Sequence, residues 1–169
     1  KGCAELVASS YRRSFLQDQG IGIASVRAGN VIGGGDWADD RLIPDILRSF
    51  EKNKPVVIRN PKATRPWQHV LEPLSGYLIL AQNLYKDQKK YAEGWNFGPN
   101  EKDVQPVDWI LDKMISKWPD SSWELDNNSS PHEAGFLKLD ILKAKSKLGW
   151  SPVWELSQTL EKIVSWHQA

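Results

Sequence analysis

The sequence predicts an α/β fold, because stretches with a helical apolar period alternate along the chain with short stretches rich in β-branched residues. Apolar residues recur every three or four positions between Ala4 and Phe15, which is typical of a helix. Ile21–Ala28, by contrast, is a short run rich in Ile and Val that follows a glycine. Such a run predicts a buried strand in a parallel sheet, with neighbouring strands expected outside this chain.

The elements of the first half are expected in the following order. The first helix ends at Gly20, a natural stop, and the segment Asn30–Asp36, with its three glycines, forms a loop. Pro44 lies in the first turn of a second helix, which Lys54-Pro55 ends. The apolar face of that helix consists of Ile43, Ile46, Leu47 and Phe50. The helix is followed by a short strand, Val56–Ile58, and by a turn at Asn60-Pro61.

The second half continues the alternation. Pro73 and Pro106 open two further helices, and the apolar spacing of residues 156–164 predicts the last one. Short strands are expected at Trp95–Phe97 and Phe136–Leu139. Asp140 is expected to cap a small helix that ends at Gly149.

Composition excludes several classes of partner. The 169 residues are 40% hydrophobic and 25% charged, enough apolar material for a core, and the net charge is +1. A balance so near neutrality does not favour nucleic acid or an anionic membrane as a partner. The sequence contains no apolar run near the ~18 residues of a membrane span, and it shows no secretory leader. The single cysteine, Cys3, fits a reducing compartment, so we expect a cytoplasmic protein.

The sequence does not carry the common short catalytic motifs. The glycine triplet lacks the spacing of a phosphate-binding loop, although a loop after a parallel strand is where ligands bind in such sheets. The three histidines are scattered, so no metal site is expected. Three arginines are candidates for a phosphate clamp, the alternative being solvated surface charges: Arg41, Arg59 and Arg65.

The nine tryptophans allow two interpretations. Aromatic faces stack on sugars and bases, which would fit a carbohydrate site. Trp also has a large apolar surface, and we expect most of the nine to be anchors of the core.

Several segments, taken in order, resemble the extended short-chain dehydrogenase/reductases that act on nucleotide sugars. Lys1-Gly2-Cys3-Ala4-Glu5 resembles the Lys-x-x-x-Glu after their catalytic tyrosine. Arg27–Gly33 resembles the strand and loop that end their dinucleotide fold, and Arg41-Leu42-Ile43-Pro44 resembles a helix start of the nucleotide-sugar enzymes. The later landmarks also match: Arg65-Pro66-Trp67-Gln68-His69-Val70, in which Pro66 replaces the usual Asp, Trp95-Asn96-Phe97-Gly98, and Leu148-Gly149-Trp150-Ser151-Pro152.

Within that superfamily the resemblance is to the CDP-glucose 4,6-dehydratases and covers nearly the whole chain. It is carried by Gly33–Trp37, by the block Arg65–Tyr77 and by Pro131–Ala134. The resemblance implies the C-terminal portion of an NAD-dependent lyase that converts CDP-glucose to CDP-4-keto-6-deoxyglucose. The C4 hydroxyl is oxidised by hydride transfer to NAD, water is eliminated across C5 and C6, and the hydride returns to C6.

The resemblance also assigns roles to residues. Lys1 matches the lysine that holds the nicotinamide ribose and lowers the pKa of the catalytic tyrosine, since a nearby cation favours phenolate. Cofactor contacts are implied for Lys1, Arg27, Ala28, Gly29, Asn30 and Val31. Substrate contacts are implied for Asn30, Arg41, Leu42, Ile43, Arg65, Trp67 and His132.

The organisation implied by the resemblance is the end of a Rossmann-type doubly wound parallel sheet, residues 1–35, followed by a smaller α/β substrate lobe, residues 36–169. The first helix packs in a dimer interface in relatives, so a homodimer is expected. The glycine fingerprint and the catalytic tyrosine are expected upstream, so we expect the 169 residues alone to be inactive.

Two alternatives stay open. One is a related epimerase or reductase of another nucleotide sugar. The other is a non-catalytic nucleotide-sugar-binding protein, because fold alone does not fix function.

Overall fold

The computed structural model describes residues 2–127 and 135–169, which form two compact units. Unit 1 contains residues 2–29, 71–98 and 139–153, and unit 2 contains 30–70, 99–127 with 135–138, and 154–169. The boundaries between the two units therefore fall at several points along the chain. The expected division after residue 35, between the end of the Rossmann-type sheet and the substrate lobe, stays a prediction. No helix in the described part of the chain is long and apolar enough to cross a membrane.

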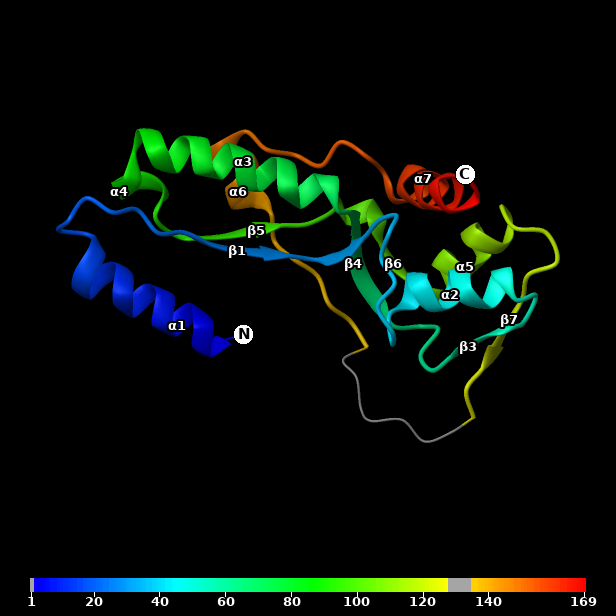
Figure 1. The fold of residues 1–169 in the computed structure, drawn as a ribbon. Coiled ribbons are helices and arrows are strands. Elements are labelled where there is room, and N and C mark those ends of the chain that lie inside the picture. The colour runs from blue at the N-terminus through cyan, green and yellow to red at the C-terminus, as the bar shows by residue number, and fades with distance from the viewer. Residues whose placement is uncertain (1, 128–134) are drawn as a thin grey trace. The chain divides into compact units, whose positions relative to one another are not determined.

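Unit 1 places helices on both faces of a parallel strand pair. Its strands are β1 (Ser25–Ala28) and β5 (Gly94–Phe97), with Ala28 opposite Phe97. Figure 1 shows α1 on one face of this pair and α3 with α6 on the other. The helices of the unit are α1 (Gly2–Tyr11), its π-helical continuation η1 (Arg12–Leu16), α3 (Leu71–Lys86), α4 (Gln88–Tyr91) and α6 (Leu142–Leu148).

The core of unit 1 is built around large aromatic rings. Trp95 and Phe97 are fully buried on β5, and Trp150 is 2% exposed. The indole N–H of Trp95 donates to the Tyr91 carbonyl at 3.0 Å, and that of Trp150 donates to Ser75 Oγ at 3.0 Å. Because their polar atoms are satisfied, both rings can be buried at low cost. Both tryptophans are therefore core anchors, as the second interpretation of the composition predicts.

Unit 1 confirms two expectations and corrects one. The first helix forms, and Gly149 ends α6 in the left-handed conformation (φ 67°), as its position predicts. The expected strand Ile21–Ala28 is regular only from Ser25, and its partner β5 lies within this chain. The pairing joins Ser25–Ala28 to Gly94–Phe97, and none of the residues of β1 is buried within the described structure.

Unit 2 contains two small sheets. In the first, β2 (Asn30–Ile32) pairs in parallel with β4 (Thr64–His69), which pairs antiparallel with β6 (Val104–Pro106). In the second, β3 (Val56–Ile58) is parallel to β7 (Trp123–Leu125). The helices are α2 (Leu42–Glu51), the single turn η2 (Glu101–Asp103), α5 (Val107–Ile115) and α7 (Leu156–Gln168).

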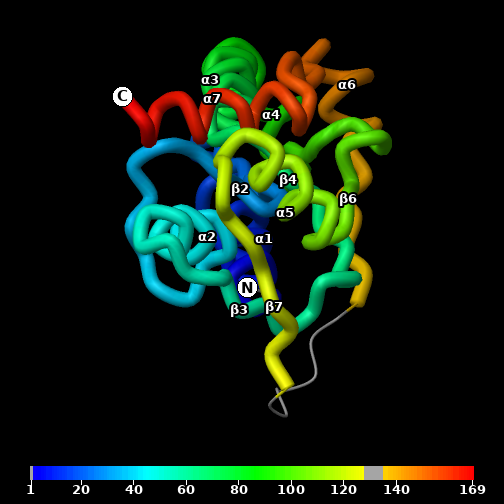
Figure 2. Tube along the Cα trace, turned by 90° about the vertical axis from the view of Figure 1, so that its right-hand side faces the viewer, coloured from blue at the N-terminus to red at the C-terminus, as the bar shows by residue number. Residues whose placement is uncertain are grey.

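The helices of unit 2 bury one apolar stripe each. Figure 2 shows α2, α5 and α7 grouped around β2 and β4. The stripes come together in one core, which includes the apolar face predicted for the second helix: Ile43, Ile46, Leu47 and Phe50 of α2, Ile110, Leu111 and Met114 of α5, and Leu156, Leu160, Ile163 and Val164 of α7.

Unit 2 differs from expectation in its strands. The first three residues of the expected loop Asn30–Asp36 form β2, because β4 offers them a parallel partner. The expected strand Phe136–Leu139 is reduced to one bridge between Phe136 and Thr64. Among the described residues, the sequence patterns do not predict the strands β4, β6 and β7. Pro66 in β4 and Pro106 in β6 argue against strands from sequence alone.

Candidate functional site

The loop that follows β2 is the centre of the candidate site in unit 2. It runs from Gly33 to Arg41 between the carboxyl end of β2 and the start of α2. Ligands of open α/β sheets bind at the carboxyl ends of parallel strands, so this loop lies where a ligand is expected.

The Asp36 carboxylate organises this loop and orients Arg41. Its Oδ1 accepts a hydrogen bond from the Ala38 amide at 3.1 Å, and its Oδ2 pairs with Arg41 Nη1 at 3.1 Å. The Arg41 side chain is 63% exposed and precedes the first turn of α2. Its guanidinium is therefore held at one edge by Asp36 while other donors face solvent, which suits the binding of an anion.

Arg48 of α2 supports the same loop from the other side. Its Nη1 donates to the Trp37 carbonyl at 3.0 Å, and its Nη2 donates to the Ala38 carbonyl at 3.3 Å. The guanidinium also pairs with Asp45 on the same helix and with Asp39 at 3.4 Å. No sequence pattern predicts this role, because the acceptors are backbone carbonyls ten and eleven residues away.

Arg65 approaches from β4, where it lies opposite Gln105 of β6. It is half-buried, and its Nη1 donates to the Thr64 carbonyl at 3.0 Å. The segment from Gly135 to Leu137 runs beside it, since Thr64 receives a hydrogen bond from Leu137 N at 3.1 Å and donates one to Gly135 O at 2.9 Å.

Arg59, the third arginine of the predicted phosphate clamp, is half-exposed. It lies 3.8 Å from the carboxylate of Asp40, in the loop that ends at Arg41. Arg41 and Arg59 are thus both paired with carboxylates of one loop, whereas Arg65 belongs to the neighbouring sheet.

Four of the predicted substrate-binding residues lie in or against the core and the sheet of unit 2. Trp67 is 5% exposed, and its indole N–H donates to the Gln105 carbonyl at 3.0 Å. Ile43 is buried and Leu42 packs against the same core, so Trp67, Ile43 and Leu42 join the site to the core of unit 2. Asn30 is half-buried on β2 opposite Trp67. Substrate contacts for these four residues stay predictions.

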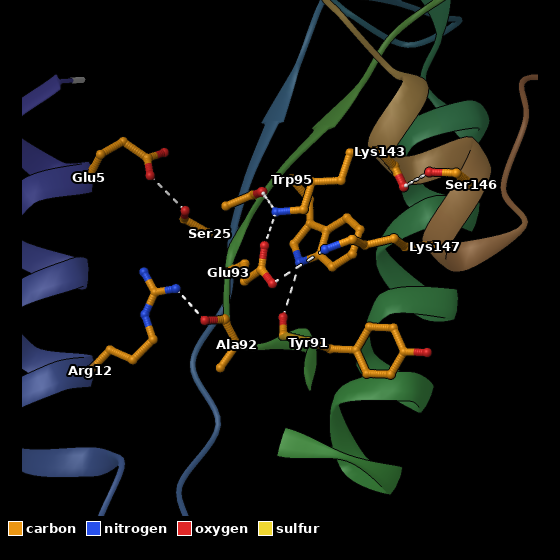
Figure 3. Close-up of polar contacts among 11 residues, drawn as sticks. Glu5, Arg12, Ser25, Tyr91, Ala92, Glu93, Trp95, Lys143, Ser146 and Lys147 are labelled. Atoms are coloured by element: carbon orange, nitrogen blue, oxygen red, sulfur yellow. Dashed lines mark hydrogen bonds and ion pairs between the residues drawn. The ribbon is translucent and has the colours of Figure 1, made fainter. Parts of the chain in front are cut away.

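The predicted cofactor residues of unit 1 lie at the end of β1. The Arg27 guanidinium pairs with Glu5 of α1 at 3.2 Å, and the same carboxylate accepts from Ser25 Oγ at 2.6 Å (Figure 3 shows Glu5 facing Ser25). Gly29 N donates to the Phe97 carbonyl at 3.2 Å. Ala28 and Gly29 have little or no side chain at this strand end, and their contact with the cofactor stays a prediction. The remaining cofactor residues, Asn30 and Val31, begin β2.

Two predicted site residues, Lys1 and His132, lie outside the described residues. Within the described ranges, no group of three His, Cys, Asp or Glu side chains is arranged to hold a metal ion.

His69 lies close to the start of the candidate loop, since a Cβ atom built on Gly33 would be 4.0 Å from its Nε2. It ends β4, is 9% exposed, and its ring meets Trp154 edge-on at a centroid distance of 4.7 Å. The only signal for it is its place in the matched block, because a lone histidine has no spacing to test.

Comparison with known proteins finds relatives of the chain both by sequence and by structure. A sequence model described as the NAD dependent epimerase/dehydratase family matches residues 2–96. The chain is 61% identical over 175 aligned residues to the CDP-glucose 4,6-dehydratase of Salmonella typhimurium, covering 100% of this chain and 49% of the relative. It is 27% identical to UDP-glucuronic acid decarboxylase 1 of Arabidopsis thaliana, covering 98% of this chain and 36% of that protein.

Solved structures share the fold. A UDP-glucuronic acid 4-epimerase from Bacillus cereus, in complex with UDP-glucuronic acid and NAD, has a TM-score of 0.75 at 22% identity. A dTDP-glucose 4,6-dehydratase from Bacillus anthracis, in complex with NAD, has a TM-score of 0.76 at 18% identity. The match covers 97% and 98% of this chain and 49% of each structure. The Rossmann-type α/β class is therefore confirmed, and the chain spans at most about half the length of the relatives described here.

Proposed function

Because this chain belongs to the NAD-dependent epimerase/dehydratase family, we propose that the protein containing it is a CDP-glucose 4,6-dehydratase. The observation that carries the proposal is 61% identity, extending over the whole chain, to a CDP-glucose 4,6-dehydratase. In the proposed reaction the C4 hydroxyl of the glucose unit becomes a ketone, water leaves across C5 and C6, and C6 becomes a methyl group. NAD, the cofactor of the family, accepts a hydride from C4 and returns it to C6, so it is not consumed.

The described residues have distinct parts in this proposal. Arg41 and Arg65 bind the diphosphate of the nucleotide sugar, since guanidinium forms paired, charge-assisted hydrogen bonds with phosphate oxygens. Arg59 adds positive charge near Arg41, because it pairs with Asp40, the residue that precedes Arg41. The strand end at Ala28 and Gly29 gives the cofactor access to the backbone. Lys1 and His132 keep the roles that the resemblance implies, as predictions.

We also propose that the full-length protein is a cytoplasmic homodimer. The stripe predicted to pack in a dimer is uncovered in unit 1: α1 has no buried residue, and Val7, Tyr11 and Phe15 are each more than half exposed. Apolar side chains at helical spacing on one face are what a helix–helix interface requires.

An isotope experiment on the full-length protein tests the reaction. CDP-glucose carrying deuterium at C4 should give CDP-4-keto-6-deoxyglucose with that deuterium in the C6 methyl group, because the hydride returns within one active site. NMR of the product measures its position.

Other outcomes of the same experiment would refute the proposal. Inversion at C4 with retention of the C6 hydroxyl would indicate an epimerase. Turnover of a UDP-sugar in place of CDP-glucose would indicate another family activity. Binding without turnover would indicate a non-catalytic protein.

A further inference from the structure

The indole ring of Trp166, on α7, rests directly on the backbone of the loop after β2. A Cβ atom built on Gly34 would lie 2.5 Å from Trp166 Cδ2 and 2.7 Å from its Cγ. Real carbon atoms do not approach so closely, so only glycine allows this ring to reach the loop. The helix that carries Trp166 is itself fixed, because Ile163 and Val164 are buried in the core of unit 2.

A second ring extends this contact along the loop. Trp37 lies with its ring centroid 6.4 Å from that of Trp166 and 5.5 Å from that of His167. His167 Nε2 lies 3.0 Å from Glu51 Oε1, at the end of α2. Although Trp37 and Trp166 are each more than half exposed, they pack on each other and on the loop.

The loop is therefore held between two helices. Trp166 of α7 contacts it at Gly34, and Arg48 of α2 binds its carbonyls at Trp37 and Ala38. Asp36 lies between these two supports and binds Arg41. A shift of the loop at Gly34 would therefore move the carboxylate that orients Arg41.

We propose that Trp166 is a positioning residue for nucleotide-sugar binding, which it supports by seating the loop so that Asp36 holds Arg41 toward the substrate. This inference rests on the proposed function, because it requires Arg41 to bind the diphosphate. Without the ring, the loop samples more conformations, so each binding event includes the free-energy cost of ordering the loop.

The first test compares Trp166→Ala and Trp166→Phe in the full-length protein. We expect Trp166→Ala to raise the KM for CDP-glucose on the order of ten- to a hundredfold, as small displacements of binding groups do, with kcat nearly unchanged. Trp166→Phe should recover most of the loss, because a smaller ring still covers Gly34. Ser165→Ala, an exposed neighbour on the same helix, is the control and should behave as wild type.

A double-mutant cycle tests the contact itself. Gly34→Ala alone should raise the KM, since its methyl group meets the ring. In the Trp166→Ala background the same methyl group has room, so Gly34→Ala should add little further loss. Independent, additive effects of the two substitutions would overturn the proposed contact. An unchanged KM in Trp166→Ala would overturn the positioning role.

A ligand-free measurement separates this inference from the proposed function. Amide hydrogen exchange of residues 33–41 should be faster in Trp166→Ala than in wild type. Faster exchange in a protein that does not turn over CDP-glucose would mean that the proposed function is wrong while the loop contact is right. If Trp166→Ala fails to fold, Gly34→Ala and Trp166→Phe still test the inference: a wild-type KM for Gly34→Ala would overturn it.

Discussion

Arg41 and Arg65 are supported in different ways, which allows their contributions to be separated. Arg41 is mostly exposed and is held by the Asp36 carboxylate, whereas Arg65 is half-buried on a strand and bound to a backbone carbonyl. Arg41 therefore depends on the loop after β2 for its orientation, and Arg65 depends on the sheet.

At the residue scale, we predict that Arg65→Ala in the full-length protein weakens CDP-glucose binding by roughly ten- to a hundredfold. A charge-assisted hydrogen bond contributes about 1.5–3 kcal/mol, which corresponds to that range. NAD binding should stay normal, since Arg65 is not among the predicted cofactor residues. Calorimetric titration with each ligand measures both, and a CDP-glucose affinity equal to wild type would contradict the assignment.

At the scale of elements, the fold shifts the pKa values of two carboxyl groups in opposite directions. Burial raises the pKa of Asp103 above its ordinary 3.8, although the hydrogen bond from the Leu156 amide at the start of α7 and the nearby Lys102 lower it. By contrast, a hydrogen bond from Lys143 of α6 lowers the pKa of Glu93 below 4.5 (Figure 3 shows this pair beside Trp95).

The sign of each shift fixes a pH dependence. When folding raises the pKa of a carboxyl group, as for Asp103, the free energy of unfolding falls as pH rises from 3.8 through the folded pKa. The reason is that the unfolded chain gives up the proton at a lower pH than the folded protein does. Asp103→Asn keeps an acceptor for the Leu156 amide and removes this loss, so its advantage over wild type should grow across that interval. Glu93→Gln should do the reverse, with a deficit above pH 4.5 that disappears as pH falls through the folded pKa of Glu93.

Unfolding midpoints of the full-length variants over a pH series measure these differences. A pH-independent offset between Asp103→Asn and wild type would contradict the burial argument. A Glu93→Gln deficit that persists at low pH would contradict the ion-pair argument.

The elements also show what sequence patterns can and cannot predict. The main helices were recognisable because each has a long apolar stripe, and α6 because Gly149 follows it. The strand β4 was not recognised, since Thr64–His69 contains a proline and an arginine, and its pairing with β2 and β6 depends on residues more than thirty positions away. For the same reason Arg41 and Arg65 were found through matched motifs, whereas Arg48 and Trp166, which act through backbone atoms of another segment, were not.

At the scale of the whole molecule, we predict that the full-length protein sediments as a dimer at micromolar concentration. A charge placed on the exposed stripe, as in Tyr11→Glu on α1 or Phe15→Glu on η1, should shift the protein toward monomer, because burying an unpaired carboxylate is costly. Ser10→Glu, which changes an exposed residue away from the stripe, is the control. Sedimentation of the wild type as a strict monomer would contradict the proposal.

The interleaving of the two units has a consequence for biosynthesis. The chain passes from one unit to the other at residues 29/30, 70/71, 98/99, 138/139 and 153/154, so each unit is assembled from separated segments. Unit 2 cannot complete its core before the ribosome has released residues 154–169, since α7 supplies part of it. Apolar faces that are synthesised early, such as that of α2, stay incompletely covered while more than a hundred further residues are translated. Nascent chains of this protein should therefore depend on chaperones until α7 emerges.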